Sequence, residues 1–96
     1  MKRIIVKLEV RALNADQLMT RFYFDFRDAS GILRDDAGEE LPSATIARKE
    51  ALRIVGQAVN DLTYRHSEGC VVIDVRDGEG AVLRVSAVFE TTPLKE

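Results

Sequence analysis

The stretch from Ser43 to about His66 constrains the fold most, because it has the period of one long amphipathic helix. Its apolar residues recur at spacings of three and four, which places them on one side of a helix. This stripe consists of Ala44, Ala47, Ala51, Val55, Ala58 and Leu62, flanked by Leu52 and Val59. Ser43 follows a proline and is suited to cap the first turn through its hydroxyl. Gly69 is expected to stop the helix.

The stripe is rich in alanine, and small side chains allow a helix to lie close to a neighbouring surface. In water the usual neighbour is a β-sheet that carries large side chains. The segment 21–27 provides them, because Phe22, Phe24 and Phe26 alternate with more polar residues at the strand period. We therefore expect the three phenylalanines to face the helix.

Four further segments have the alternation or the apolar content of strands, namely 4–10, 32–34, 71–76 and 82–90. A turn at 28–31 sets Phe26 opposite Leu33. A three-residue loop at 78–80, with Gly80 in the left-handed conformation, sets Val75 opposite Leu83. The same register sets Asp74 opposite Arg84, a cross-strand pair of opposite charge.

The predicted order is strand, strand, short strand, helix, strand, strand. It indicates an α+β fold, an antiparallel sheet of four to five strands with one long helix packed on one face. The 96 residues are expected to form a single domain, in which 1–18 is an N-terminal extension strand, 19–90 the core and 91–96 a tail. The extension strand needs a sheet edge. If that edge belongs to another copy, the result is a strand-exchanged dimer.

The face of the sheet away from the helix is expected to be a polar contact patch. Its predicted members are Tyr23, Asp25, Arg27, Asp74, Arg76 and Arg84. Asp25 and Asp74 could approach each other there as an acid–base pair. The three arginines on the same face favour neutralised ion pairs instead.

The chain has few residues suited to catalysis or metal binding. One histidine and one cysteine, His66 and Cys70, cannot complete a zinc site. A thiol nucleophile would also need an orienting group that the sequence does not indicate. The acidic stretch 35–40 does not match a calcium loop. We therefore assign no catalytic, cofactor-binding or metal-binding residue and expect no cofactor.

Charge and cysteine content limit the partners and the compartment. A net charge of −2 gives no general attraction to nucleic acid or to an anionic membrane. The single cysteine cannot form an internal disulfide, which favours a reducing, cytoplasmic location. No apolar run approaches a membrane span, and the N-terminus has no signal-peptide pattern.

A composite motif starts at 21–28, Arg-Phe-Tyr-Phe-Asp-Phe-Arg-Asp, and continues through Gly31, Asp35 and Gly38 to Glu-Leu-Pro at 40–42. It resembles the short bacterial proteins grouped as domain of unknown function 6894. The resemblance covers about 19–90, including a final hairpin at 71–89. It implies no activity, because the family has no assigned function. Met19 matches the usual family start, which leaves 1–18 as an addition.

Three classes of function are compatible with these features. The first is a small non-catalytic protein-binding or regulatory module, whose partner is another copy or a different protein. The second is an antitoxin-like or nucleic-acid-linked regulator, suggested by architecture alone. The third is an enzyme, which would need Asp25 in a pocket with a raised pKa.

Overall fold

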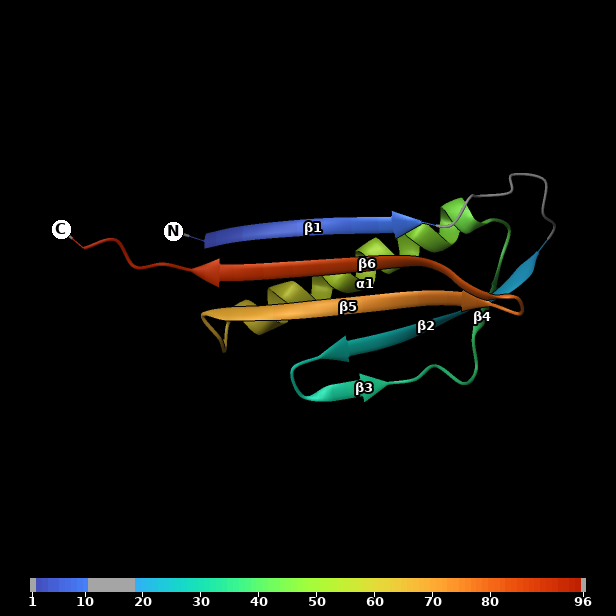
Figure 1. Ribbon diagram of the computed structural model, residues 1–96, viewed down its shortest axis with the longest axis horizontal. Coiled ribbons are helices and arrows are strands. Elements are labelled where there is room, and N and C mark those ends of the chain that lie inside the picture. The colour runs from blue at the N-terminus through green and yellow to red at the C-terminus, as the bar shows by residue number, and fades with distance from the viewer. Residues whose placement is uncertain (1, 11–18, 96) are drawn as a thin grey trace.

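The computed structural model describes residues 2–10 and 19–95 of the protein (Figure 1). Within these residues, one helix packs against one face of an antiparallel sheet. The strands are β1 (Lys2–Val10), β2 (Thr20–Asp28), β3 (Gly31–Leu33), β4 (Glu39–Leu41), β5 (Glu68–Asp77) and β6 (Gly80–Thr91), and the helix is α1 (Ala44–Thr63). Parts of the predicted extension and tail, residues 1, 11–18 and 96, lie outside the described residues.

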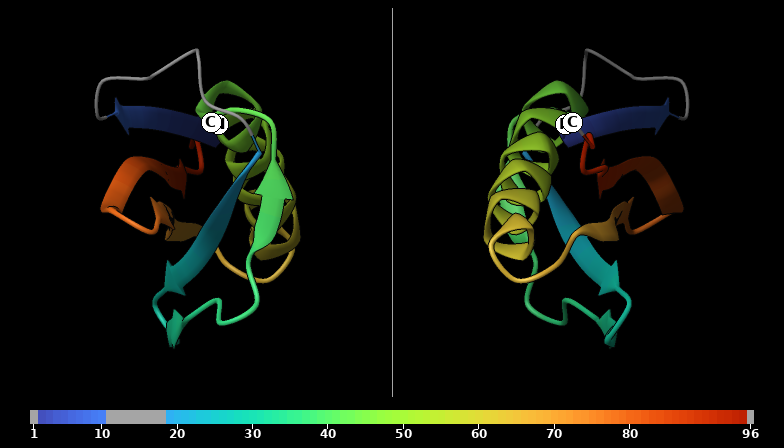
Figure 2. Two further views of the ribbon diagram at one scale, coloured as in Figure 1. Left: turned by 90° about the vertical axis from the view of Figure 1, so that its right-hand side faces the viewer. Right: turned by 90° about the vertical axis from the view of Figure 1, so that its left-hand side faces the viewer.

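The strand order across the sheet is β1-β6-β5-β2-β3, and β4 pairs with the start of β2. The helix packs mainly on β5 and β6, with a smaller contact to β4. The end-on views of Figure 2 show the helix on one side of the sheet and no element on the other side within the described part of the chain. The predicted α+β fold with one helix on one sheet face is confirmed.

The sheet has one strand more than predicted, because the end of the acidic stretch is not a loop. Glu39 and Glu40 are exposed and form β4 together with the buried Leu41. This strand pairs with Thr20–Phe22, the first residues of β2. A three-residue strand with a single buried apolar residue has too little alternation to be recognised in a sequence.

The helix begins as predicted and ends three residues early. Ser43 is extended, and its Oγ accepts a hydrogen bond from the backbone amide of Ile46 at 3.2 Å. The helix ends at Thr63, with Tyr64 as its C-cap residue. Its buried positions are Ala44, Ala47, Ala51, Val55 and Val59, while Ala58 and Leu62 are only partly buried. Among the described residues, no helix has the length and apolar character needed to cross a membrane.

Replacing the helix cap Ser43 with alanine is expected to lower the free energy of unfolding by about 1 kcal/mol. The change leaves the amide of Ile46 without its side-chain acceptor. Thermal or urea unfolding followed by circular dichroism measures the loss. Thr45→Ala, at an exposed position in the first turn, is the control. Equal stability of Ser43→Ala and the wild type would show that the cap contributes nothing.

The three phenylalanines of β2 share the helix side of the sheet, as predicted. Phe22 is fully buried, and Phe24 and Phe26 are partly buried against the same core. Phe26 lies opposite Leu33, which confirms the predicted register of the β2–β3 hairpin.

The hairpin of β5 and β6 has the predicted register but not the predicted turn. Val75 lies opposite Leu83, and Asp74 lies opposite Arg84. However, Asp77 pairs directly with Gly80, so only two residues form the turn, and a bulge at Val82 takes up the extra residue. The bulge buries both Val82 and Leu83, at 2% and 4% exposure. Gly80 does have the expected positive φ.

Gly69 was expected to stop the helix, but it lies inside β5 opposite Phe89. A Cβ atom at this position would lie 2.6 Å from Cε1 of the Phe89 ring. The glycine is therefore needed so that the buried aromatic ring can lie over the backbone of the neighbouring strand.

The N-terminal strand has a partner within its own chain. β1 pairs with β6 along its whole length, from Lys2 opposite Thr91 to Val10 opposite Leu83. This places β1 at one edge of the sheet and β3 at the other (Figure 1).

Candidate functional site

The six residues predicted for the polar patch all lie on the sheet face that α1 leaves uncovered. They alternate along β2, β5 and β6 with the buried residues of the helix side. Cross-strand pairing brings them together, since Tyr23 lies opposite Arg76 and Asp25 lies opposite Asp74. Asp74 lies opposite Arg84 on its other side. We call this surface the uncovered face.

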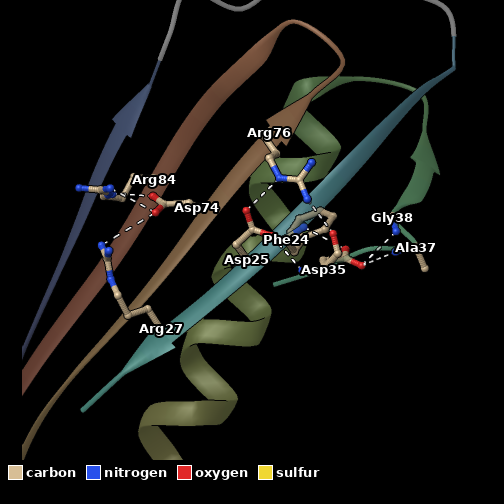
Figure 3. A network of polar contacts seen from close by, with 9 residues as sticks. All are labelled: Phe24, Asp25, Arg27, Asp35, Ala37, Gly38, Asp74, Arg76 and Arg84. Carbon is tan, nitrogen blue, oxygen red and sulfur yellow. Dashed lines mark hydrogen bonds and ion pairs between the residues drawn. The ribbon is translucent and has the colours of Figure 1, made fainter. Parts of the chain in front are cut away.

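Asp25 and Arg76 form the most protected ion pair of the uncovered face (Figure 3). Nε of Arg76 donates to Oδ2 of Asp25 at 2.9 Å, and the two side chains are 24% and 16% exposed. The guanidinium also donates through Nη2 to the carbonyl of Asp35 at 2.7 Å. The amide of Asp35 donates to Oδ1 of Asp25 at 2.9 Å, which closes a ring of three residues. The ring ties the connection between β3 and β4 to strands β2 and β5.

The Asp35 carboxylate fixes the same connection from within. Its Oδ2 accepts from the amide of Phe24 at 3.0 Å. Phe24 lies between the part of β2 that pairs with β4 and the part that pairs with β3. Its Oδ1 accepts from the amides of Ala37 and Gly38 at 3.1 and 3.0 Å. Sequence reasoning missed this role. The only local signal was an aspartate three residues before a glycine, a spacing typical of a side-chain-capped turn.

Gly38 is required at this turn for two reasons. Its φ of 71° is in the left-handed region. A Cβ atom there would also lie 2.8 Å from Cε2 of Tyr23. The Tyr23 ring in turn stacks under the guanidinium of Arg76, 4.3 Å from the ring centroid. The turn at Gly38, the aromatic ring of Tyr23 and the Asp25–Arg76 ion pair thus pack as one unit.

Asp74 is shared by two arginines. Arg84 donates to both of its carboxylate oxygens, at 2.5 and 3.2 Å. Arg27 approaches Oδ2 more loosely, at 3.9 Å. The hydrogen bonds from Arg84 to Asp74 raise the pKa of the guanidinium above its ordinary value. Two carboxylates directly across a strand pair repel each other, and the arginines neutralise them.

The surroundings of Asp25 do not favour proton transfer near neutral pH. Burial would raise the pKa of Asp25, but hydrogen bonds from Arg76 and from the Asp35 amide outweigh it and lower the pKa below the ordinary value of 3.8. A general acid near neutral pH needs the opposite shift. Asp25 and Asp74 lie opposite each other, yet Asp25 is paired with Arg76, and Asp74 is paired with Arg84 and more loosely with Arg27.

Acid is expected to destabilise the fold through Asp25 and Asp35. Hydrogen bonds from the amides of Gly38 and Phe24 lower the pKa of Asp35 below 3.8. A lowered pKa in the folded state stabilises the fold at pH values above the unfolded pKa, and this stability is lost as the pH falls through the folded pKa. Urea unfolding between about pH 6 and pH 2.5 measures the loss. Asp25→Asn should lose less stability over this range than the wild type, and equal losses would contradict the assignment.

His66 and Cys70 line one hollow between the end of α1 and the β2–β3 turn, together with Asp28 and Arg65. The Asp28 carboxylate accepts hydrogen bonds from Oγ and the amide of Ser30, at 2.5 and 2.8 Å, which lower its pKa. The carboxylate therefore orders the β2–β3 turn. Among residues 2–10 and 19–95, no three His, Cys, Asp or Glu side chains are grouped to hold a metal ion.

Comparison with known proteins gives a family but no function. No curated protein and no solved structure matches the chain significantly. One family model, described as a domain of unknown function (DUF6894), matches residues 21–89. The match runs from β2 to Phe89 of β6 and leaves β1 outside. It contains all three residues of the Asp25–Asp35–Arg76 ring. It confirms the resemblance found in the sequence. The chain belongs to the DUF6894 family.

Proposed function

We propose that this protein is a non-catalytic protein-binding module, and that it recognises its partner through the uncovered face. The observation that carries the proposal is an exposed apolar row on the same sheet face as the ion pairs, four residues along β5 and β6 from Asp74 and Arg84. Val88 lies opposite Ile5 on one side and opposite Cys70 on the other. Ile5 and Val88 are each 49% exposed, and Cys70 is exposed as well.

An apolar row flanked by charged groups is typical of a surface that binds protein. The ion pairs fix the position of each charge before a partner arrives, because Asp25, Asp74 and their arginines already hold one another. A preorganised surface loses less side-chain freedom on binding than a mobile one. Mixed charge beside apolar side chains fits a partner protein with a complementary mixed surface.

The same geometry argues against a nucleic-acid partner. Phosphate binding needs cationic groups that are available to the backbone. Arg76 and Arg84 are each engaged with an aspartate, and Arg27 lies beside Asp74. The cytoplasm is the proposed location, supported by the free, exposed thiol of Cys70.

The test compares tagged wild type with Val88→Asp after gentle purification from the native host. The wild type should retain a protein partner in near-equal amount, with or without nuclease. Val88→Asp should lose this partner while keeping its circular dichroism spectrum, because a charge in the row disfavours apolar contact. Tyr64→Asp is the control, since Tyr64 is 85% exposed at the end of α1. Loss of the partner on nuclease treatment, or its retention by Val88→Asp, would contradict the proposal.

A further inference from the structure

The two edges of the sheet are built differently. At one edge, β3 and β4 are three residues each, and hydrogen bonds of Asp35 tie the connection between them to the sheet. Short, interrupted edge strands resist pairing with another chain. At the other edge, β1 presents nine continuous residues. One side of β1 pairs with β6, and within the described residues no strand pairs with its other side (Figure 1).

β1 is also more apolar than an exposed edge usually is. Ile4, Val6, Leu8 and Val10 point to the helix side, because they pair with the buried residues of β6. The helix packs on β5, β6 and β4, so Ile4, Val6 and Val10 remain 48%, 52% and 44% exposed. A long apolar edge of this kind is where a further strand would add.

One register of β1 against a second β1 brings opposite charges together. A two-fold axis through Val6 pairs all nine residues of β1 with those of a second antiparallel β1. Arg3 then lies opposite Glu9 twice, which is favourable across strands, and Ile4 lies opposite Leu8. Moving the axis by one residue along β1 also keeps the helix sides of the two sheets on the same face, but fewer residues then pair and like charges lie opposite each other. An axis at Ile5 sets Arg3 opposite Lys7, and an axis at Lys7 sets two lysines opposite each other.

We propose that β1 pairs antiparallel with β1 of a second copy about a two-fold axis at Val6, which joins two sheets into one. Each β1 keeps its pairing with β6 of its own chain, so no strand is exchanged. Isologous pairing of this kind closes after two copies and leaves no free β1 edge. The uncovered face stays accessible in both copies, so this inference does not rest on the proposed function.

Cross-linking of the full chain tests the axis directly. Facing residues of antiparallel strands have Cα atoms about 4.5–5.5 Å apart, within the range that a disulfide spans. In a Cys70→Ser background, Val6→Cys should therefore form a disulfide-linked dimer under mild oxidation. Ile4→Cys is the matched control. Residue 4 would lie opposite Leu8 of the second copy, four residues away from that copy's residue 4, so the two cysteines could not meet. This variant should remain monomeric on a non-reducing gel. Failure of Val6→Cys to cross-link, as in a strand-exchanged dimer, would overturn the proposal, as would equal cross-linking of both variants.

A charge exchange tests the register independently of any cysteine. Sedimentation should show that Arg3→Glu and Glu9→Arg each weaken dimerisation roughly tenfold, because each sets like charges opposite one another twice. The double variant should restore dimerisation. It should not restore thermal stability, because Arg3 also lies opposite Glu90 and Glu9 opposite Arg84 within the chain. A folded double variant that stays monomeric, or a wild type that is monomeric at all concentrations, would overturn the proposal.

Discussion

Replacing Phe22 with alanine is expected to lower the free energy of unfolding by about 3–5 kcal/mol. The Phe22 ring is fully buried and is among the largest side chains of the core. It lies in β2 opposite Glu39 of β4, and the buried Leu41 of that strand belongs to the same core. Removing the ring leaves a cavity that the alanine-rich helix surface cannot fill. Since a domain of this size has a total stability of roughly 5–15 kcal/mol, the variant should be close to unfolded at 37 °C.

Urea unfolding followed by circular dichroism measures this loss. Leu33→Ala is the control, because Leu33 is also a large apolar residue at the β2–β3 hairpin but is 71% exposed. Its loss should be within about 0.5 kcal/mol of zero. If the two variants lose equal stability, Phe22 does not lie at the centre of the core.

Asp35→Ala is expected to have the second largest effect, a loss of roughly 2–4 kcal/mol. The change removes the acceptor of three backbone amides, those of Phe24, Ala37 and Gly38. It should also loosen the Asp25–Arg76 pair, because Asp35 contacts both residues through its backbone. Faster hydrogen exchange of the three amides should accompany the loss.

Two variants make the Asp35 result specific. Asp36→Ala removes the adjacent exposed carboxylate and should change stability by no more than about 0.5 kcal/mol. Asp35→Asn keeps one side-chain oxygen as an acceptor and should lose less than Asp35→Ala. Equal losses in Asp35→Ala and Asp36→Ala would show that the effect is one of net charge rather than of these hydrogen bonds.

The main packing of this fold could be predicted because it depends on periodic patterns. The alanine stripe of α1 and the alternating phenylalanines of β2 have different periods, and each pattern identifies one buried face. The register of β5 and β6 also followed from the sequence, because only one alignment pairs Asp74 with Arg84. The bulge at Val82 could not be predicted, since a shorter turn with a bulge gives the same register as a longer turn.

The polar site was predicted in part, for a physical reason. The six residues of the patch were identified because strand alternation alone assigns them to one face. Asp35 was missed because its partner amide at Phe24 and its contact with Arg76 come from strands 11 and 41 residues away. No local spacing predicts such contacts. The partner of β1 was also left open, because pairing with its own sheet and pairing with another copy require the same alternation.

Asp25 is held ionised in a fixed ion pair with Arg76, and we propose that the ion pairs of the uncovered face shape a recognition surface. An NMR titration of the Asp25 carboxyl carbon tests whether the residue is held ionised. We expect Asp25 to titrate below the ordinary value of 3.8, and the Arg76 Nε proton to remain protected from exchange while Asp25 is ionised. A pKa for Asp25 raised toward neutrality would show that the ion pair with Arg76 does not hold it ionised, because that shift would make the residue suited to proton transfer.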